Sequence, residues 1–153
     1  MSPWATGQQA VEELLAEGLV IRLVGADAGR RDLMARAHQL LTSAGVLVDS
    51  DPATAYLVAY DAAKHAAMAL LAEQNLRVSG KNGHLVMQKV LLAQFHGVFN
   101  DFDRLRRRRN DLDYPTTAED FADNNEAHRA IETATKLVDN AEQIFERGVL
   151  TTV

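Results

Sequence analysis

Between His84 and Asp113, apolar side chains recur at alternating spacings of four and three residues. This period places them along one face of an α-helix and predicts a long amphipathic helix over 84–113. Pro115 disfavours the helical conformation at Tyr114, so we expect the helix to end there. The apolar face consists of Leu91, Phe95, Val98, Phe102 and Leu105.

Continued towards the end of the helix, the same face reaches Arg109 and Leu112. Arg109 is therefore predicted to face a packing partner, whereas Arg107 and Arg108 are predicted to point into solvent. A buried guanidinium cannot deprotonate, so it must bind a carboxylate, a carbonyl or the phosphate of a ligand. A second, polar row beside it consists of Arg106, Asn110 and Asp113.

Six consecutive residues, 104–109, contain five of the twelve arginines, and we call these arginines the arginine cluster. The other residues include 11 Lys and Arg against 21 Asp and Glu, and the net charge is −5. Such an acidic chain does not coat nucleic acid or membrane by bulk electrostatics, so the cluster predicts focal binding of an anion such as a phosphodiester. The alternative is structural: arginines near a helix C-terminus complement its dipole and pair with neighbouring aspartates.

The rest of the chain also predicts helices, because alanine and leucine are abundant and only three prolines occur. Asp51 followed by Pro52 is typical of an N-cap and a first helical residue. Thr116-x-x-Glu119 fits a capping box at the start of the last helix. The expected helices are Gln8–Ala16, ended by Gly18, then Asp27 to Gly45, Asp51 to Gln74, His84 to Asp113, and one after Pro115.

These elements predict an all-α fold, an antiparallel bundle of four long helices plus a short N-terminal helix, in a single domain over residues 1–153. Leu19–Val24 fits either a short strand or an apolar link. The alanines of the third helix fit either close packing inside one chain or a dimer surface. They are Ala59, Ala62, Ala63, Ala66, Ala67 and Ala69.

Several kinds of site are disfavoured by composition. The chain has no cysteine, which excludes disulfides and thiolate metal sites. No two of its five histidines stand at i and i+4, so neither a metal nor another cofactor is expected. There is no signal-like start and no run of about 18 apolar residues, so we expect a cytoplasmic protein without a membrane span.

The Ser79–Gly83 loop, which includes Lys81, precedes His84 at the start of a helix. Backbone N–H groups and a lysine at a helix N-terminus can hold a phosphate. The loop does not match the P-loop pattern, however, and a simple turn explains its glycines equally well. We therefore expect it to bind phosphate only if it lies near the arginine cluster.

Three segments resemble the HEPN superfamily, small helical-bundle domains of prokaryotic toxin–antitoxin and defence systems and of some eukaryotic proteins. The first is 55–67, with its Tyr60-Asp61-Ala62-Ala63 run. The second is Gly80-x-x-Gly83-His84. The third is Arg109-Asn110-x-x-x-Tyr114, at the end of a long helix.

The resemblance implies site residues. HEPN ribonucleases typically carry an arginine, a polar neighbour and then a histidine, and two such motifs face each other in a dimer that cleaves RNA without metal. By position, Arg109 and Asn110 match the first two residues, and Tyr114 stands where the histidine is expected. A tyrosine, with a pKa of about 10, is a poor base at neutral pH. The candidates for binding phosphate or RNA are Arg106, Arg107, Lys81 and His84.

Three hypotheses follow. The first is a homodimeric HEPN-like module, catalytically altered or inactive, that binds RNA, a nucleotide or a protein partner of the antitoxin or nucleotidyltransferase-like kind. The second is an active metal-independent endoribonuclease, with Arg109 stabilising the transition state and Tyr114 moving a proton. The third is a purely structural bundle whose arginines pair internally.

Overall fold

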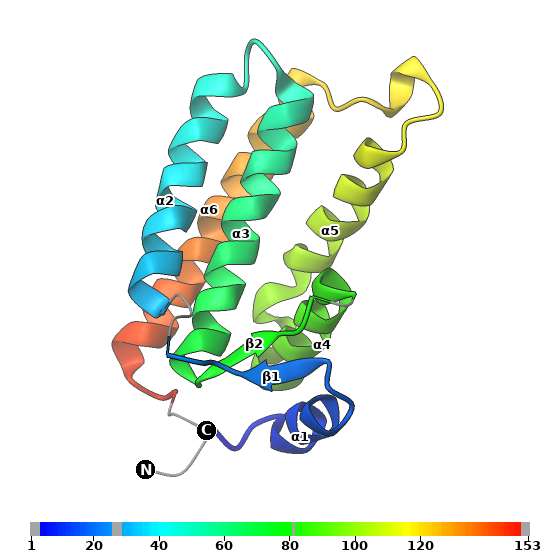
Figure 1. Ribbon diagram of the computed structural model, residues 1–153. Coiled ribbons are helices and arrows are strands. Elements are labelled where there is room, and N and C mark those ends of the chain that lie inside the picture. Colours follow the sequence, from blue (N-terminus) through cyan, green and yellow to red (C-terminus); the bar gives the residue numbers. More distant parts are fainter. Residues whose placement is uncertain (1–3, 26–28, 81, 151–153) are drawn as a thin grey trace.

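The computed structural model describes residues 4–25, 29–80 and 82–150, and Figure 1 shows their arrangement. These residues are mostly helical with one two-stranded sheet, so the predicted all-α class is confirmed. Among them, no helix combines the length and apolarity needed to cross a bilayer. In chain order the elements are α1 (Gln8–Ala16), β1 (Val20–Arg22), α2 (Arg30–Leu47), α3 (Pro52–Glu73), β2 (Leu76–Val78), α4 (Gly83–Phe95), η1 (His96–Phe99), α5 (Asn100–Asp113), η2 (Ala118–Asp120) and α6 (Asn124–Arg147).

Helix α3 begins where the sequence predicts. The Asp51 carboxylate accepts hydrogen bonds from the backbone N–H of Thr54 at 3.2 Å and from its hydroxyl at 2.6 Å, and Pro52 follows as the first helical residue. Asp51 therefore acts as the N-cap. The helix continues to Glu73 with Gln74 as its C-cap, which confirms the predicted span.

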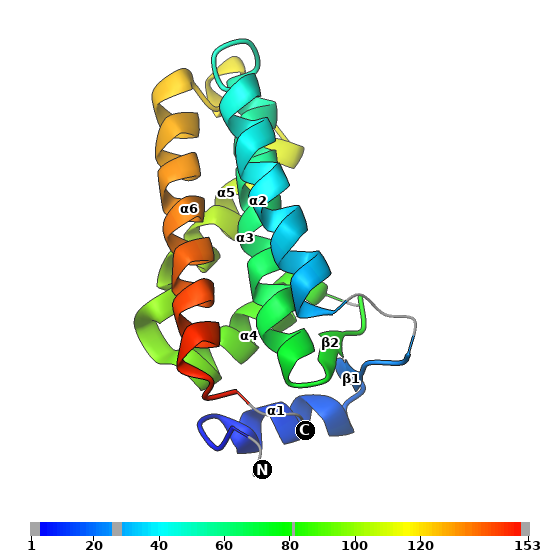
Figure 2. The same cartoon turned by 90° about the vertical axis from the view of Figure 1, so that its left-hand side faces the viewer.

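Helix α3 lies at the centre of the bundle. Figures 1 and 2 show α2 and α6 beside it, and α5 packs along a further side. Seven of its alanines are at most 2% exposed, and such small side chains let neighbouring helices approach closely. Core packing within one chain, rather than a dimer surface, accounts for Ala59, Ala62, Ala63, Ala66, Ala67 and Ala69.

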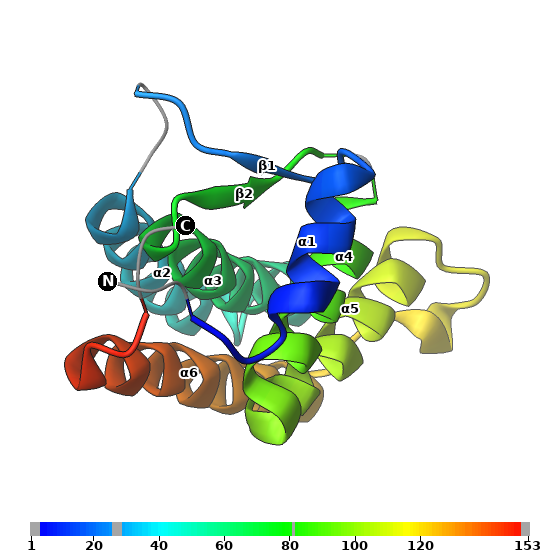
Figure 3. The same cartoon turned by 90° about the horizontal axis from the view of Figure 1, so that it is seen from below.

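The segment after α1 contains a short strand. Strands β1 and β2 pair antiparallel, with Val20 opposite Val78, and Figures 2 and 3 show this ribbon and α6 on opposite sides of α3. Helix α1 packs on α4 next to Gly7, where φ is +74° and an added Cβ would lie 2.6 Å from the carbonyl group of Ala93. Both the backbone conformation and this close approach favour glycine there.

The long helix predicted over 84–113 is broken into α4, η1 and α5. His96 has a φ of +50°, which interrupts the α-helix and shifts its register. Phe99 is 3% exposed and takes the core position predicted for Val98, which is 50% exposed. Beyond the break, Phe102 and Leu105 are buried as predicted, because their spacing lies wholly within α5.

The sequence predicts that helix α2 ends at Gly45, but the helix continues to Leu47. Ala44 and Val48 on either side are buried, and their packing outweighs the cost of about 1 kcal/mol for a glycine inside a helix. The start predicted at Asp27 lies outside the described residues.

The last helix begins later than predicted. The capping box is formed by Thr117 and Asp120, one residue beyond the predicted pair, and it caps the short helix η2. Helix α6 starts at Asn124, where the Asp123 carboxylate accepts a hydrogen bond from the backbone N–H of Glu126 at 2.8 Å. The N-cap Asp123, and not the capping box of Thr117 and Asp120, therefore begins α6.

A buried pair of glutamines joins the end of α3 to α4. Gln74 and Gln94 are 1% and 3% exposed, and their side-chain amides donate hydrogen bonds to each other at 2.9 and 2.6 Å. Gln74 also donates to the carbonyl of Leu70 at 3.2 Å. The reciprocal bonds satisfy both amides where no solvent reaches them.

Replacing Gln94 by methionine, which has a similar length, should lower the free energy of unfolding by about 2 kcal/mol, because Gln74 stays buried without its partner. In the double variant Gln74→Met/Gln94→Met no buried amide of this pair remains. The double variant should therefore lose less free energy of unfolding than the two single variants lose in sum. Urea unfolding of the four proteins measures this coupling. Additive losses would show that the amides do not stabilise each other.

Candidate functional site

Arg109, in the last turn of α5, lies against α3. Its guanidinium carbon is 5.5 Å from the ring centroid of Tyr60, a distance at which a cation is attracted to the ring face. Its Nη1 donates to the Asp113 carboxylate at 2.9 Å. Its Nε is buried and has no hydrogen-bond partner among the described residues. The predicted inward orientation of Arg109 is confirmed, and one donor of the guanidinium is unused.

His84, in the first turn of α4, contacts the same tyrosine. Its Nδ1 is hydrogen-bonded to the Tyr60 hydroxyl, and the two ring centroids are 5.3 Å apart. Tyr60 is 0% exposed and also packs on Phe102 of α5 at 5.4 Å. Tyr60 thus connects α3 with both α4 and α5. We call Tyr60, His84 and Arg109 the tyrosine-bridged site.

The surroundings of this site decide the charge of its side chains. Burial lowers the pKa of His84 below its ordinary value, and the nearby cations Lys64 and Arg109 lower it further. Burial raises the pKa of Tyr60, against an opposing effect of Arg109. At neutral pH the site therefore presents a neutral imidazole and a protonated phenol beside a permanent cation.

Each arginine of the cluster contacts a carboxylate. Arg108 was predicted to point into solvent, but its side chain is only 25% exposed because Glu126 of α6 lies opposite and binds it. One aspartate, Asp103, serves two arginines, so the paired groups retain one excess positive charge. The pairs are Arg104–Asp101, Arg106–Asp103, Arg107–Asp103, Arg108–Glu126 and Arg109–Asp113.

The other predicted site residues that the structure describes lie outside the tyrosine-bridged site. Tyr114, the C-cap of α5, is 75% exposed, and Asn110 is also exposed. The side chain of Arg107 is 72% exposed, whereas that of Arg106 is 23% exposed. Lys81 lies outside the described residues. Within one chain, Arg109 and His84 therefore both contact Tyr60, whereas Tyr114 lies at the surface.

Tyr60 is the site residue that sequence reasoning missed. Its sequence position marks it only as part of the first HEPN-like segment, whereas its hydroxyl is bound to His84. No local pattern signals the contact, because the two residues are 24 positions apart and meet only through the fold. Within the described ranges, no group of three or more His, Asp or Glu side chains is placed to hold a metal ion.

The imidazole of His84 should titrate below the ordinary histidine pKa of 6.5 in an NMR pH titration. Arg109→Gln should raise this pKa, because the substitution removes a neighbouring cation, while Arg36→Gln on α2 should leave it unchanged. Protonation of His84 is disfavoured only in the folded state, whereas the unfolded chain takes up this proton near pH 6.5. The free energy of unfolding should therefore fall as the pH falls below about 6.5. An unchanged His84 pKa in Arg109→Gln would contradict the proximity of the two groups.

Comparison with known proteins agrees with the resemblance seen in the sequence. The family model described as HEPN domain matches residues 31–144, a span that runs from α2 into α6 and includes the tyrosine-bridged site. No curated protein and no solved structure matches the chain significantly. The matched span covers most of the chain, which therefore belongs to the HEPN domain family.

Proposed function

We propose that this HEPN domain is a homodimeric module that binds RNA through the tyrosine-bridged site, with altered cleavage chemistry. One observation carries the proposal. The three segments of the HEPN resemblance each contribute one residue to this site: Tyr60 from the first, His84 from the second and Arg109 from the third. Segments far apart in the sequence thus converge on one aromatic ring.

The chemistry of the site suits a phosphodiester. Arg109 is a permanent cation held against the ring of Tyr60, and an arginine can bind a phosphate through two parallel hydrogen bonds. Arg106 lies close enough to affect the pKa of His84, so a second cation is near. Binding through these cations releases counterions from the RNA, so affinity should fall steeply as salt rises.

The proposal that the cleavage chemistry is altered depends on Tyr114. A tyrosine replaces the histidine that the family uses to activate the 2′-hydroxyl, and its side chain is 75% exposed. In a homodimer, this exposed end of α5 would meet its counterpart in the second copy and bring two arginine motifs together. The same exposed surface would serve a protein partner of the antitoxin or nucleotidyltransferase-like kind.

A second candidate function is metal-independent RNA cleavage, and the contact between His84 and Tyr60 favours it. In the neutral tautomer whose Nδ1–H donates to the Tyr60 oxygen, the Nε2 of His84 carries the free lone pair that can accept the 2′-hydroxyl proton. The 2′-oxygen then attacks phosphorus, the bond to the 5′-oxygen breaks, and that oxygen takes up a proton. The products are a 2′,3′-cyclic phosphate and a 5′-hydroxyl, and Arg109 stabilises the charge on the phosphate.

The deciding experiment incubates the protein with structured and single-stranded RNA in EDTA, and compares wild type with Arg109→Ala, Tyr114→His and His84→Gln. The proposed function predicts salt-sensitive RNA binding without cleavage, lost in Arg109→Ala, and cleavage that appears in Tyr114→His. Cleavage by wild type that is lost in both Arg109→Ala and His84→Gln would instead establish the ribonuclease. Wild type that neither binds nor cleaves would refute both.

Two controls separate this outcome from a structural role of the arginines. Arg36→Ala on α2 removes the same charge elsewhere and should retain RNA binding. Arg109→Ala should change stability by about 1 kcal/mol or less, because Asp113 is 34% exposed and keeps its contact with water. A sharp fall in the melting temperature of Arg109→Ala, with no RNA binding by wild type, would support a purely structural bundle.

A further inference from the structure

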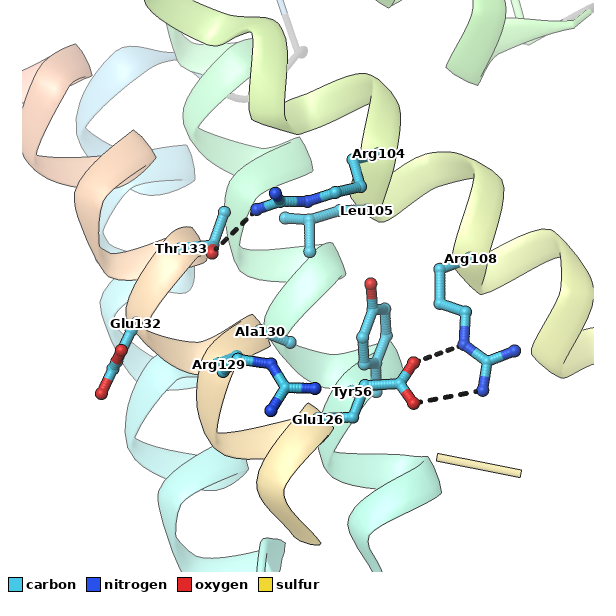
Figure 4. A pocket seen from close by; sticks show the side chains of 9 residues that line it. All are labelled: Tyr56, Arg104, Leu105, Arg108, Glu126, Arg129, Ala130, Glu132 and Thr133. Carbon is cyan, nitrogen blue, oxygen red and sulfur yellow. Dashed lines mark hydrogen bonds and ion pairs between the residues drawn. The ribbon is translucent and has the colours of Figure 1, made fainter. Parts of the chain in front are cut away.

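A cavity of about 490 Å³ lies between α3, α5 and α6. Figure 4 shows side chains from all three helices around it, with Leu105 and Ala130 as apolar lining and the ion pair of Arg108 and Glu126 on one side. Its volume is typical of sites for small organic ligands, which combine apolar walls with a few polar groups.

Tyr56 supplies an unused donor to this cavity. Its side chain is 4% exposed and lines the cavity, yet its hydroxyl makes no hydrogen bond within the described part of the chain. Burial raises the pKa of Tyr56 to about 12, and the Glu126 carboxylate acts in the same direction. The hydroxyl therefore keeps its proton at neutral pH. The hydroxyl oxygen is accessible from the cavity, so it can donate a hydrogen bond to an acceptor on a bound ligand.

Arg129 adds a positive charge to the wall of the cavity. Arg108 is bound by Glu126, but Arg129 forms no ion pair in the described residues. Figure 4 shows the Arg129 guanidinium directed toward Tyr56 and Glu126, while Glu132 points away from the other lining side chains. The free polar groups that face the cavity are thus donors, and they suit an anion.

We infer that this cavity binds a small aromatic oxyanion, a flat ring that carries a carboxylate, sulfonate or phosphate group. The ring would lie against Leu105, Ala130 and the ring of Tyr56, and the oxyanion would accept hydrogen bonds from the Tyr56 hydroxyl and Arg129. Apolar contact alone would admit many ligands, and the two donors select those with an anionic group.

This site is separate from the tyrosine-bridged site. Consecutive residues of an α-helix point about 100° apart, so Arg108 and Arg109 leave α5 in different directions. Arg108 lines the cavity shared with α6, whereas Arg109 lies on Tyr60. The inference is therefore independent of the proposed RNA binding.

Fluorescence titration with anilinonaphthalene sulfonate tests the inference, with phenylnaphthylamine, the same rings without the sulfonate, as the matched neutral probe. Wild type should bind the sulfonate with one-to-one stoichiometry. Arg129→Gln should weaken this binding by about tenfold, since one charge-assisted hydrogen bond is lost, and Tyr56→Phe by about fivefold. Neither substitution should change the affinity for phenylnaphthylamine. Ala130→Leu, which fills the cavity, should abolish binding of both probes.

Arg36→Gln is the control for loss of one positive charge and should bind the sulfonate as wild type does. Equal sulfonate affinity in wild type, Arg129→Gln and Tyr56→Phe would overturn the inference, as would equal weakening in Arg36→Gln. If a thermal melt shows that Ala130→Leu does not fold, the other two variants still decide, because Arg129 is exposed and Tyr56→Phe removes a single oxygen.

Discussion

The close packing of α3 against its neighbours is the constraint on which the other features depend. Most of its buried positions are alanines, so α2 and α6 can pack close to the α3 backbone. On the side of α5 the sequence provides two tyrosines instead, Tyr56 and Tyr60, one helical turn apart. Their rings occupy the space between α3 and α5, as the contact of Tyr60 with Phe102 shows. Both candidate sites are built on these two rings, and the rigid alanine packing of α3 fixes where the rings stand.

Helix α5 adds the charged groups to this framework. Its arginines are consecutive, so the helical twist distributes them around the axis and gives each a different environment. Arg108 reaches α6 and is held by Glu126, while Arg109 reaches α3 and lies on Tyr60. The same run of sequence therefore contributes to an ion pair that shapes one cavity and to a cation that completes the tyrosine-bridged site. The composition of the run alone does not distinguish these two roles.

The sequence predicted features that depend on local chemistry. The Asp51 N-cap and the end of α5 before Pro115 follow from capping and from proline geometry, and both are confirmed. The break at His96, where φ is positive, was not predicted, because the apolar spacing continues across it. The partner of Arg108 was missed for a related reason: Glu126 is 18 residues away and meets it only after α5 and α6 have packed. The inward direction of Arg109 was predicted, since it depends only on spacing within α5.

The carboxylates around the arginine cluster are compatible with anion binding. Asp113 stands one turn after Arg109 on the same helix and is 34% exposed, and ion pairs of this kind contribute only about 0.3 to 0.5 kcal/mol. The pair uses Nη1 and leaves the buried Nε free. A phosphate that replaced Asp113 could bind Nη1 and Nη2 together and so form the bidentate contact that one aspartate oxygen does not provide. Asp113 and the ring of Tyr60 hold the guanidinium in one orientation, and such preorganisation lowers the entropic cost of binding an anion there.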